Sequence, residues 1–287
     1  MFGTAVGLAV AWLSTPARAA WPEDVDLYSM LDQEGEPVLD REVLGTSYRQ
    51  LVMELGTMVA NKPITPASTV GLYGFDADLS TQFVLTEARD RKGEPSPWNR
   101  AHRDEDSAPY AILPTLTVRK GLPLSTEIGA SFGWIGGSST GVIGGFGRVA
   151  VFEGYKPIPD VSLKLGYSGY VGSDQLDCGA LDLSVTMGST FAVGRLPGVN
   201  TGEIAPWVTF TTLRVSANAT IDDETENDIG ALRYSRTPKE EDDEAPIAIP
   251  QVGGGVQFVS GNAHVRLGAS WAPATIPTVS TGFGFTF

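Results

Sequence analysis

The 287-residue sequence predicts an all-β fold, a closed antiparallel transmembrane β-barrel of about ten strands (range about 8–12) that follows a short helical N-terminal segment. Three observations predict it. Apolar and polar residues alternate with a period of two from Thr69 to the end of the chain. The alternating runs have about ten residues or more, as a tilted membrane-crossing strand needs, whereas strands of soluble sheets usually have about five or six. The connections between the runs alternate between long and short.

Composition and charge narrow the functions that the chain can have. The sequence has 20 basic and 34 acidic residues and a net charge of −14, which excludes nucleic acid as a partner. The mean hydropathy of −0.01 is the value expected when an apolar and a polar face cancel. The single cysteine, Cys178, cannot form an internal disulfide, so the stability of the fold must come from other contacts.

Residues 1–19 are predicted to be a secretory signal peptide. The uncharged apolar run Ala5 to Leu13 is too short to span a bilayer as a helix, and it is followed by Pro16 and the small-residue site Ala17-Arg18-Ala19. The absence of a basic residue from Met1 to Thr4 departs from the usual signal pattern. Cleavage would send the remainder of the chain out of the cytoplasm.

Residues 20–68 are predicted to form a periplasmic or lumen-plugging segment with an amphipathic helix at about 41–60. Apolar residues recur there at spacings of three and four, at Leu44, Tyr48, Leu51, Leu55 and Met58. The polar face is not rich in Lys or Arg, so packing on or inside the following domain is preferred to binding at a membrane surface.

Residues 69–287 are predicted to form the barrel. The expected strands lie at about 69–87, 110–120, 123–135, 140–153, 160–171, 181–193, 204–219, 250–260, 262–271 and 276–287. When the connections between strands are numbered along the chain, the long ones at about 88–109 and 220–249 are the first and the seventh. The tight turns at Lys120 to Leu122 and near Gly261 are the second and the eighth. Odd- and even-numbered connections lie at opposite ends of such a barrel. Long loops on one side and short turns on the other are typical of outer-membrane barrels. A soluble exported β-sandwich shows the same alternation, but the signal peptide and strand length favour the barrel.

Charged residues within the expected strands fall on the less apolar face, which we expect to line the lumen, because a charge facing the bilayer midplane costs about 2–4 kcal/mol. The Lys and Arg residues of this set nearly balance its Asp and Glu residues in charge, which indicates ion pairs across the lumen. The alternative is a narrow polar passage that these residues line. The set comprises Asp76, Asp78, Arg119, Glu127, Arg148, Lys164, Asp182, Arg214, His264 and Arg266.

The chain ends in Phe283-Gly284-Phe285-Thr286-Phe287, with an aromatic residue at the C-terminus and at two and four positions before it. This resembles the C-terminal signature of Gram-negative outer-membrane β-barrel proteins. The resemblance implies that Phe283, Phe285 and Phe287 form an insertion signal read by the barrel-assembly machinery. It also implies that the protein lies in outer-membrane lipid, and it identifies no particular family.

A barrel of this size has an interior largely filled by side chains. The preferred interpretation is a narrow channel for a small solute or ligand, for which the helix at 41–60 is a candidate gate. The alternative is an envelope-structural or surface-interaction protein with acidic loops. The enzymes among outer-membrane barrels of this size need an Asp-His pair or a Ser-His unit. The only histidines of this sequence are His102 and His264. We therefore expect no enzymatic activity and no cofactor.

The loop at 220–249 holds two acidic clusters. Asp222, Asp223, Glu224 and Asp228 could bind calcium, but the spacing lacks the glycine and the ordered alternation of a calcium loop. A solvated acidic loop is therefore the preferred interpretation.

Overall fold

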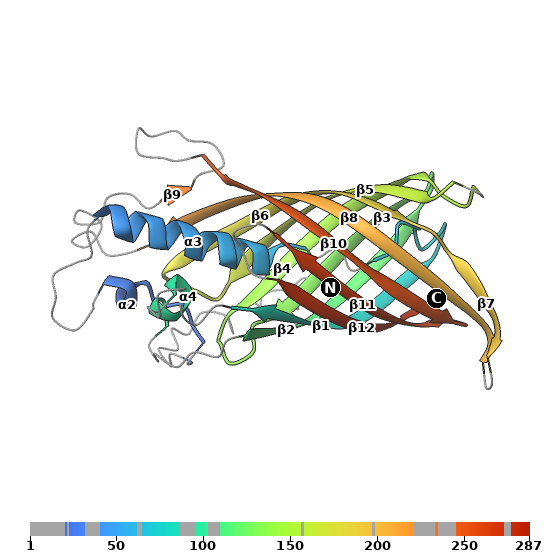
Figure 1. The fold of residues 1–287 in the computed structure, drawn as a ribbon, viewed down its shortest axis with the longest axis horizontal. Helices are drawn as coiled ribbons and strands as arrows, with labels where there is room; N and C mark the ends of the chain where they lie inside the picture. Colours follow the sequence, from blue (N-terminus) through green and yellow to red (C-terminus); the bar gives the residue numbers. More distant parts are fainter. Residues whose placement is uncertain are drawn as a thin grey trace, which may run out of the picture.

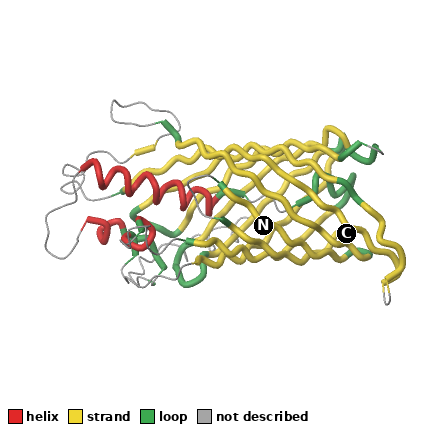
Figure 2. Tube along the Cα trace, viewed as in Figure 1, coloured by secondary structure: helices red, strands yellow, loops and turns green. Residues whose placement is uncertain are grey.

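Ten antiparallel strands close into a barrel in the structure, a computed structural model, as the alternating pattern predicts (Figures 1 and 2). The structure describes residues 21, 23–31, 41–61, 65–86, 96–102, 110–155, 158–196, 199–220, 233–234, 245–272 and 277–287. The barrel strands are β1 (Phe75–Leu85), β2 (Tyr110–Leu122), β3 (Thr126–Trp134), β4 (Gly141–Phe152), β5 (Asp160–Val171), β6 (Leu176–Gly188), β8 (Val199–Ala219), β10 (Ile247–Ser260), β11 (Ala263–Trp271) and β12 (Thr278–Thr286).

Two pairings complete the ring. β8 pairs with β10, and β1 pairs with β12, with Asp76 opposite Thr286 and Val84 opposite Thr278. Closure leaves no unpaired edge among these strands over their shared length, which is what a sheet in hydrocarbon requires.

The remaining elements lie at the two ends of the barrel. They are α2 (Leu27–Leu31), α3 (Arg41–Val59), α4 (Pro97–Arg100), β7 (Phe191–Leu196) and β9 (Arg233–Tyr234). We call the end that holds α2, α4 and β9 the loop end, and the end that holds the turns 123–125 and 261–262 and the C-terminus the turn end. Among the described helices, none is both long enough and apolar enough to cross a membrane.

Several predicted strands have different bounds in the structure, and in two of them a turn of the chain is the cause. The first begins at Phe75 and not at Thr69, because residues 69–74 turn at the mouth of the barrel, where Gly71 and Tyr73 have φ of 77° and 68°. The run 181–193 is not one strand: β6 ends at Gly188, and β7 turns away to pair with the start of β8 beyond the turn end.

The period of two places apolar side chains outward and polar side chains inward. On β6, Leu181, Leu183, Val185 and Met187 are exposed on the outer wall, whereas Asp182 and Ser184 between them are buried. This outer wall is suited to lipid.

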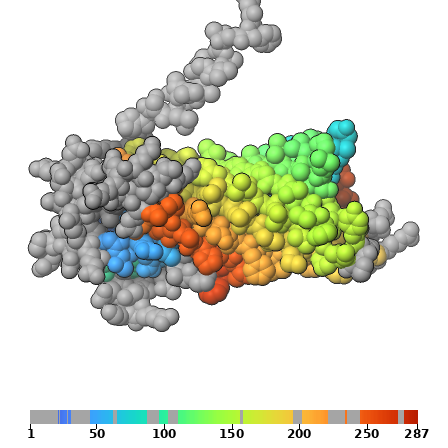
Figure 3. All heavy atoms as spheres, turned by 90° about the horizontal axis from the view of Figure 1, so that it is seen from above, coloured from blue at the N-terminus to red at the C-terminus, as the bar shows by residue number. Residues whose placement is uncertain are grey.

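The described residues between α3 and β1, 60–61 and 65–74, lie at successive levels of the lumen and form a crossing segment. Figure 1 shows α3 in blue at the loop end, lying along the barrel axis, while β1 begins at the opposite end beside the C-terminus. The amide of Phe75 donates to the carbonyl of Phe287 at 3.0 Å, which fixes the start of β1 at the turn end. In the space-filling view the blue atoms of α3 come into view at the loop end, beside the orange wall (Figure 3).

Candidate functional site

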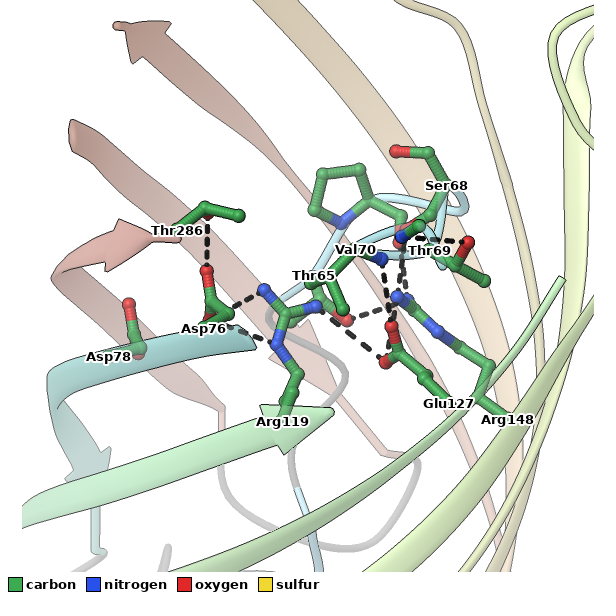
Figure 4. A network of polar contacts seen from close by, with 12 residues as sticks. Thr65, Ser68, Thr69, Val70, Asp76, Asp78, Arg119, Glu127, Arg148 and Thr286 are labelled. Carbon is green, nitrogen blue, oxygen red and sulfur yellow. Dashed lines mark hydrogen bonds and ion pairs between the residues drawn. The ribbon is translucent and has the colours of Figure 1, made fainter. Parts of the chain in front are cut away.

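The turn-end half of the lumen holds a continuous network of buried charges (Figure 4). Asp76 of β1 lies directly opposite Arg119 of β2 in the sheet, and its carboxylate accepts hydrogen bonds from Nε and Nη2 of Arg119 at 3.0 and 2.7 Å. The hydroxyl of Thr286 donates to the other oxygen at 2.9 Å. Arg266 of β11 approaches Asp78 at 3.1 Å and Asp76 at 3.5 Å.

Glu127 of β3 extends the network to the next strands. Its carboxylate lies 2.9 Å from Nη2 of Arg148, the residue opposite it on β4, and 3.7 Å from Nη1 of Arg119. All three side chains are buried. A separate pair joins Lys164 of β5 to Asp182 of β6 at 2.8 Å. Opposite charges thus lie beside one another around the wall, which is how a protein interior tolerates them.

The same wall residues hold the segment that crosses the lumen. Arg148 donates to the carbonyl of Pro66 at 2.6 Å, to the carbonyl of Ser68 at 2.8 Å and to the hydroxyl of Thr65 at 3.0 Å (Figure 4). Glu127 accepts from the amide of Val70 at 3.3 Å, and Glu153 accepts from the amide of Thr69 at 2.7 Å. Cations therefore bind the carbonyls of the segment, and anions bind its amides.

Asn61 fixes the start of this segment, just after α3. Lys164 donates to its carbonyl at 2.9 Å, and Ser131 donates to its side-chain oxygen at 2.8 Å. Its Nδ2 donates to the carbonyls of Gly145 and Tyr167 at 3.4 and 3.3 Å. A Cβ at Gly144, an inward position of β4, would lie 2.6 Å from Oδ1 of Asn61. Asn61 is not among the residues that the sequence analysis singles out. The signal that could have indicated it is Gly144, a glycine at an inward, polar position of β4, which leaves space for another group in the lumen.

The loop-end half of the lumen is apolar and is filled by α3. The predicted stripe residues Tyr48, Leu51, Leu55 and Met58 are fully buried there. They share one core with inward residues of the wall, which include Leu176, Cys178, Ala180, Leu213, Val215, Ala217, Ile247 and Ile249. A Cβ at Gly56 would clash with the methyl carbons of Val215, so this glycine lets the helix backbone contact β8 directly. Tyr48 stacks on Tyr234 with ring centroids 6.1 Å apart.

Arg214 corrects the predicted set of lumen residues. It is exposed on the outer wall of β8, while its neighbours Leu213 and Val215 are buried against α3. The prediction that the more apolar face of every strand meets lipid is wrong here, because the lumen itself is apolar where the helix fills it. The other charged residues of the set are buried inside the barrel: Asp76, Asp78, Arg119, Glu127, Arg148, Lys164, Asp182, His264 and Arg266.

The two histidines are both buried. His264 lies between the carboxylates of Asp76 and Asp78, at 3.5 and 3.4 Å. His102 contacts the carbonyl of Trp98 at 2.6 Å and packs on its ring. Within the described ranges no group of three or more potential metal ligands occurs. The signal peptide 1–19 and the acidic residues Asp222, Asp223, Glu224 and Asp228 lie outside the described residues.

Little free space remains between α3 and the network. A cavity of about 50 Å³ is bordered by Asn61, Asp78, Gln82, Lys164 and Arg266, among others. Since one water needs roughly 10–15 Å³ of such volume, the cavity has room for a few water molecules. The side-chain oxygen of Gln82 is buried without a protein partner, which a water there would supply.

A closed ten-strand barrel with an apolar outer wall and a charged interior defines an integral outer-membrane β-barrel protein, located in the Gram-negative outer membrane. No family model and no curated protein matches the chain.

Similar solved structures include the Acinetobacter baumannii outer membrane protein Omp33 (11% identity, 75% of this chain and 98% of that one, TM-score 0.28). Others are the N-terminal β-barrel domain of Pseudomonas aeruginosa OprF (10%, 76% and 99%, 0.29) and the translocator domain of the autotransporter NalP from Neisseria meningitidis (11%, 87% and 99%, 0.34).

Proposed function

We propose that the protein is a closed barrel that presents its N-terminal segment and its loops at the cell surface as an interaction surface. The observation that carries the proposal is the apolar loop-end lumen covered by α3. Each large apolar side chain contributes about 1.5–3 kcal/mol when it is fully buried. Four such residues on α3, together with the apolar wall behind them, oppose departure of the helix. A permanently filled lumen suits a surface protein better than an open channel.

The surface at the loop end is built from segments distant in sequence. The amide of Asp26 donates to the carbonyl of Ala101 at 2.7 Å, and the amide of Ser139 donates to Asp24 at 2.7 Å. Gln175 contacts both Asp26 and the amide of Leu27. Residues 23–31 thus join three loops across the mouth. Long loops of outer-membrane barrels face outward, which supports exposure of this surface outside the cell.

Cysteine labelling in intact Gram-negative cells tests this orientation. Trp21, 50% exposed at the loop end, and Tyr155, 67% exposed at the turn end, are each replaced by cysteine. The native Cys178 is buried, so it adds little background. We expect a membrane-impermeant maleimide to label W21C in intact cells and to label Y155C only after the outer membrane is permeabilised. Labelling of Y155C alone in intact cells would contradict the proposal.

A second candidate function is a narrow gated passage for a small solute. The observation that favours it is the polar turn-end half of the lumen with its cavity beside Lys164 and Arg266. Planar-bilayer recording of the refolded full chain separates the two functions. Current steps at rest support a passage, whereas a silent barrel that is correctly inserted supports the surface role.

We also propose that the C-terminal aromatic residues direct assembly. Phe283, Phe285 and Phe287 follow one another on the outer wall, and Phe287 is 71% exposed at the end of the chain. We expect F287A to lower the amount of folded barrel in cell membranes by at least half. The matched variant F210A, which removes an exposed phenylalanine from the middle of β8, should assemble normally. Both should refold equally well in detergent; a refolding defect in F287A would mean that Phe287 serves stability instead.

A further inference from the structure

A polar hollow of about 350 Å³ lies near the loop end, where β5, β6 and β8 run side by side (Figure 1). Its volume falls within the usual range for small-molecule sites. Tyr234 contributes to it from β9. The other lining residues are Tyr167, Asp177, Gly179, Ser216, Ala217 and Asn218. Gly179 pairs with Ser216, and Asp177 pairs with Asn218, so the polar groups come from neighbouring positions of two strands.

The hollow lies at the boundary of the apolar outer wall. Along β6 the outward residues from Met187 to Leu181 form an exposed apolar row, which is followed by the buried Gly179 and the exposed Asp177. Along β8 the exposed row changes from Val208 and Phe210 to Thr212, Arg214 and Asn218, with the half-buried Ser216 between the last two. The apolar row of β8 ends first, because its last member Phe210 pairs with Val185, whereas Leu181, the last member of the β6 row, pairs with Arg214. The polar positions of the hollow, from Gly179 and Ser216 to Asp177 and Asn218, thus follow the end of both apolar rows, where membrane headgroups are expected.

Arg214 gives this boundary a positive charge. It is exposed on the outer wall, one outward position and roughly 6–7 Å along the strand from Ser216. It forms no ion pair with any residue that the structure describes. An arginine on a barrel wall is costly at the bilayer midplane and tolerated near the interface. Its guanidinium matches the geometry of a phosphate group.

We propose that this hollow and Arg214 bind the headgroup of a phosphorylated glycolipid of the outer leaflet. Arg214 holds the phosphate at the edge of the apolar wall. Asp177, Ser216 and Asn218 hydrogen-bond to sugar hydroxyls farther from the membrane. The carboxylate of Asp177 repels a bare phosphate but accepts hydrogen bonds from hydroxyls, which favours a sugar-bearing headgroup over a phosphatidyl headgroup.

Unfolding in vesicles of defined composition tests the proposal. The full chain is refolded in phosphatidylcholine vesicles, in phosphatidylcholine with lipopolysaccharide, and in phosphatidylcholine with phosphatidylglycerol at equal charge. A ligand that binds only the folded barrel raises its unfolding midpoint. We expect lipopolysaccharide to raise the midpoint more than phosphatidylglycerol does. The proposal rests on the outward orientation of the loop end, but this test does not, since both leaflets contain the glycolipid.

Two variants and one control locate the effect. R214Q removes the charge, and S216L fills the hollow without changing the charge; each should lose most of the shift that lipopolysaccharide causes. K120Q, which removes a cation from the wall near the turn end, should keep the wild-type shift. An unchanged shift in both R214Q and S216L overturns the site. An equal shift with phosphatidylglycerol overturns the preference for a glycolipid and shows that the site recognises only the phosphate.

Discussion

Replacing Asp76 by asparagine will destabilise the barrel by about 3–5 kcal/mol, the usual effect of removing one partner from a buried ion pair. The substitution conserves shape but removes the charge that faces Arg119, Arg266 and His264. The guanidinium groups of Arg119 and Arg266 are buried and cannot be rehydrated without opening the wall. Urea unfolding of the refolded protein, followed by tryptophan fluorescence and by the heat-dependent mobility of folded barrels on gels, measures the loss.

Two further variants separate this effect from a general loss of charge. D174N removes an exposed carboxylate from the loop after β5, and it should change the unfolding free energy by less than about 0.5 kcal/mol. The double variant D76N/R119Q should be less destabilised than the sum of its two single variants by about 0.5–3 kcal/mol, as expected for residues in direct contact. Additive effects would show that the ion pair itself contributes little.

Replacing Gly56 by leucine will displace α3 from the wall, because no side chain fits between the helix and Val215. Overpacking of this kind costs about 1–3 kcal/mol, and more where the backbone cannot move. Cys178 reports the displacement, since its thiol is buried in the core that α3 shares with the wall. We expect maleimide to react slowly with Cys178 in the wild type and much faster in G56L.

Gly45 provides the matched control on the same helix. A Cβ at Gly45 meets no atom within 4 Å, so G45L should leave Cys178 protected and the barrel as stable as the wild type or more so. If G56L protects Cys178 as well as G45L does, the helix is not packed against β8 as described. G56L also tests the closed state: current steps that appear only in this variant identify α3 as the element that closes the lumen.

The sequence predicted the elements well where periodicity determines them. The helix expected at about 41–60 is α3 at Arg41–Val59, and the strands from β2 to β5 differ from their expected bounds by a few residues. Each rests on a repeat of 3.6 or 2 that any packed helix or barrel strand must obey. The buried charged residues were found by the same means, because a charge on one face of a strand has only the lumen as a suitable place.

What periodicity cannot supply is the content of the lumen. The alternation alone places Arg214 inward, because Leu213 and Val215 look like a lipid-facing row. In the structure α3 makes the lumen apolar there, so the two faces are reversed. The contacts of Asn61 with Lys164 and Ser131 depend on a segment about 70 to 100 residues away, and no local pattern encodes them. Inward glycines such as Gly144 leave space for that segment, but a glycine alone does not show what occupies the space.

The route of the chain through its own barrel also sets an order of assembly. The seam between β1 and β12 joins residues far apart in sequence: Asp76 and Thr286 are 210 positions from each other. Contacts of such separation carry a large loop-closure entropy and form late. The crossing segment is tied directly to β1, and the finished lumen has no room for a helix to thread. The wall must therefore close around α3, Asn61 and residues 65–70, so that the lumen is filled before β1 and β12 pair.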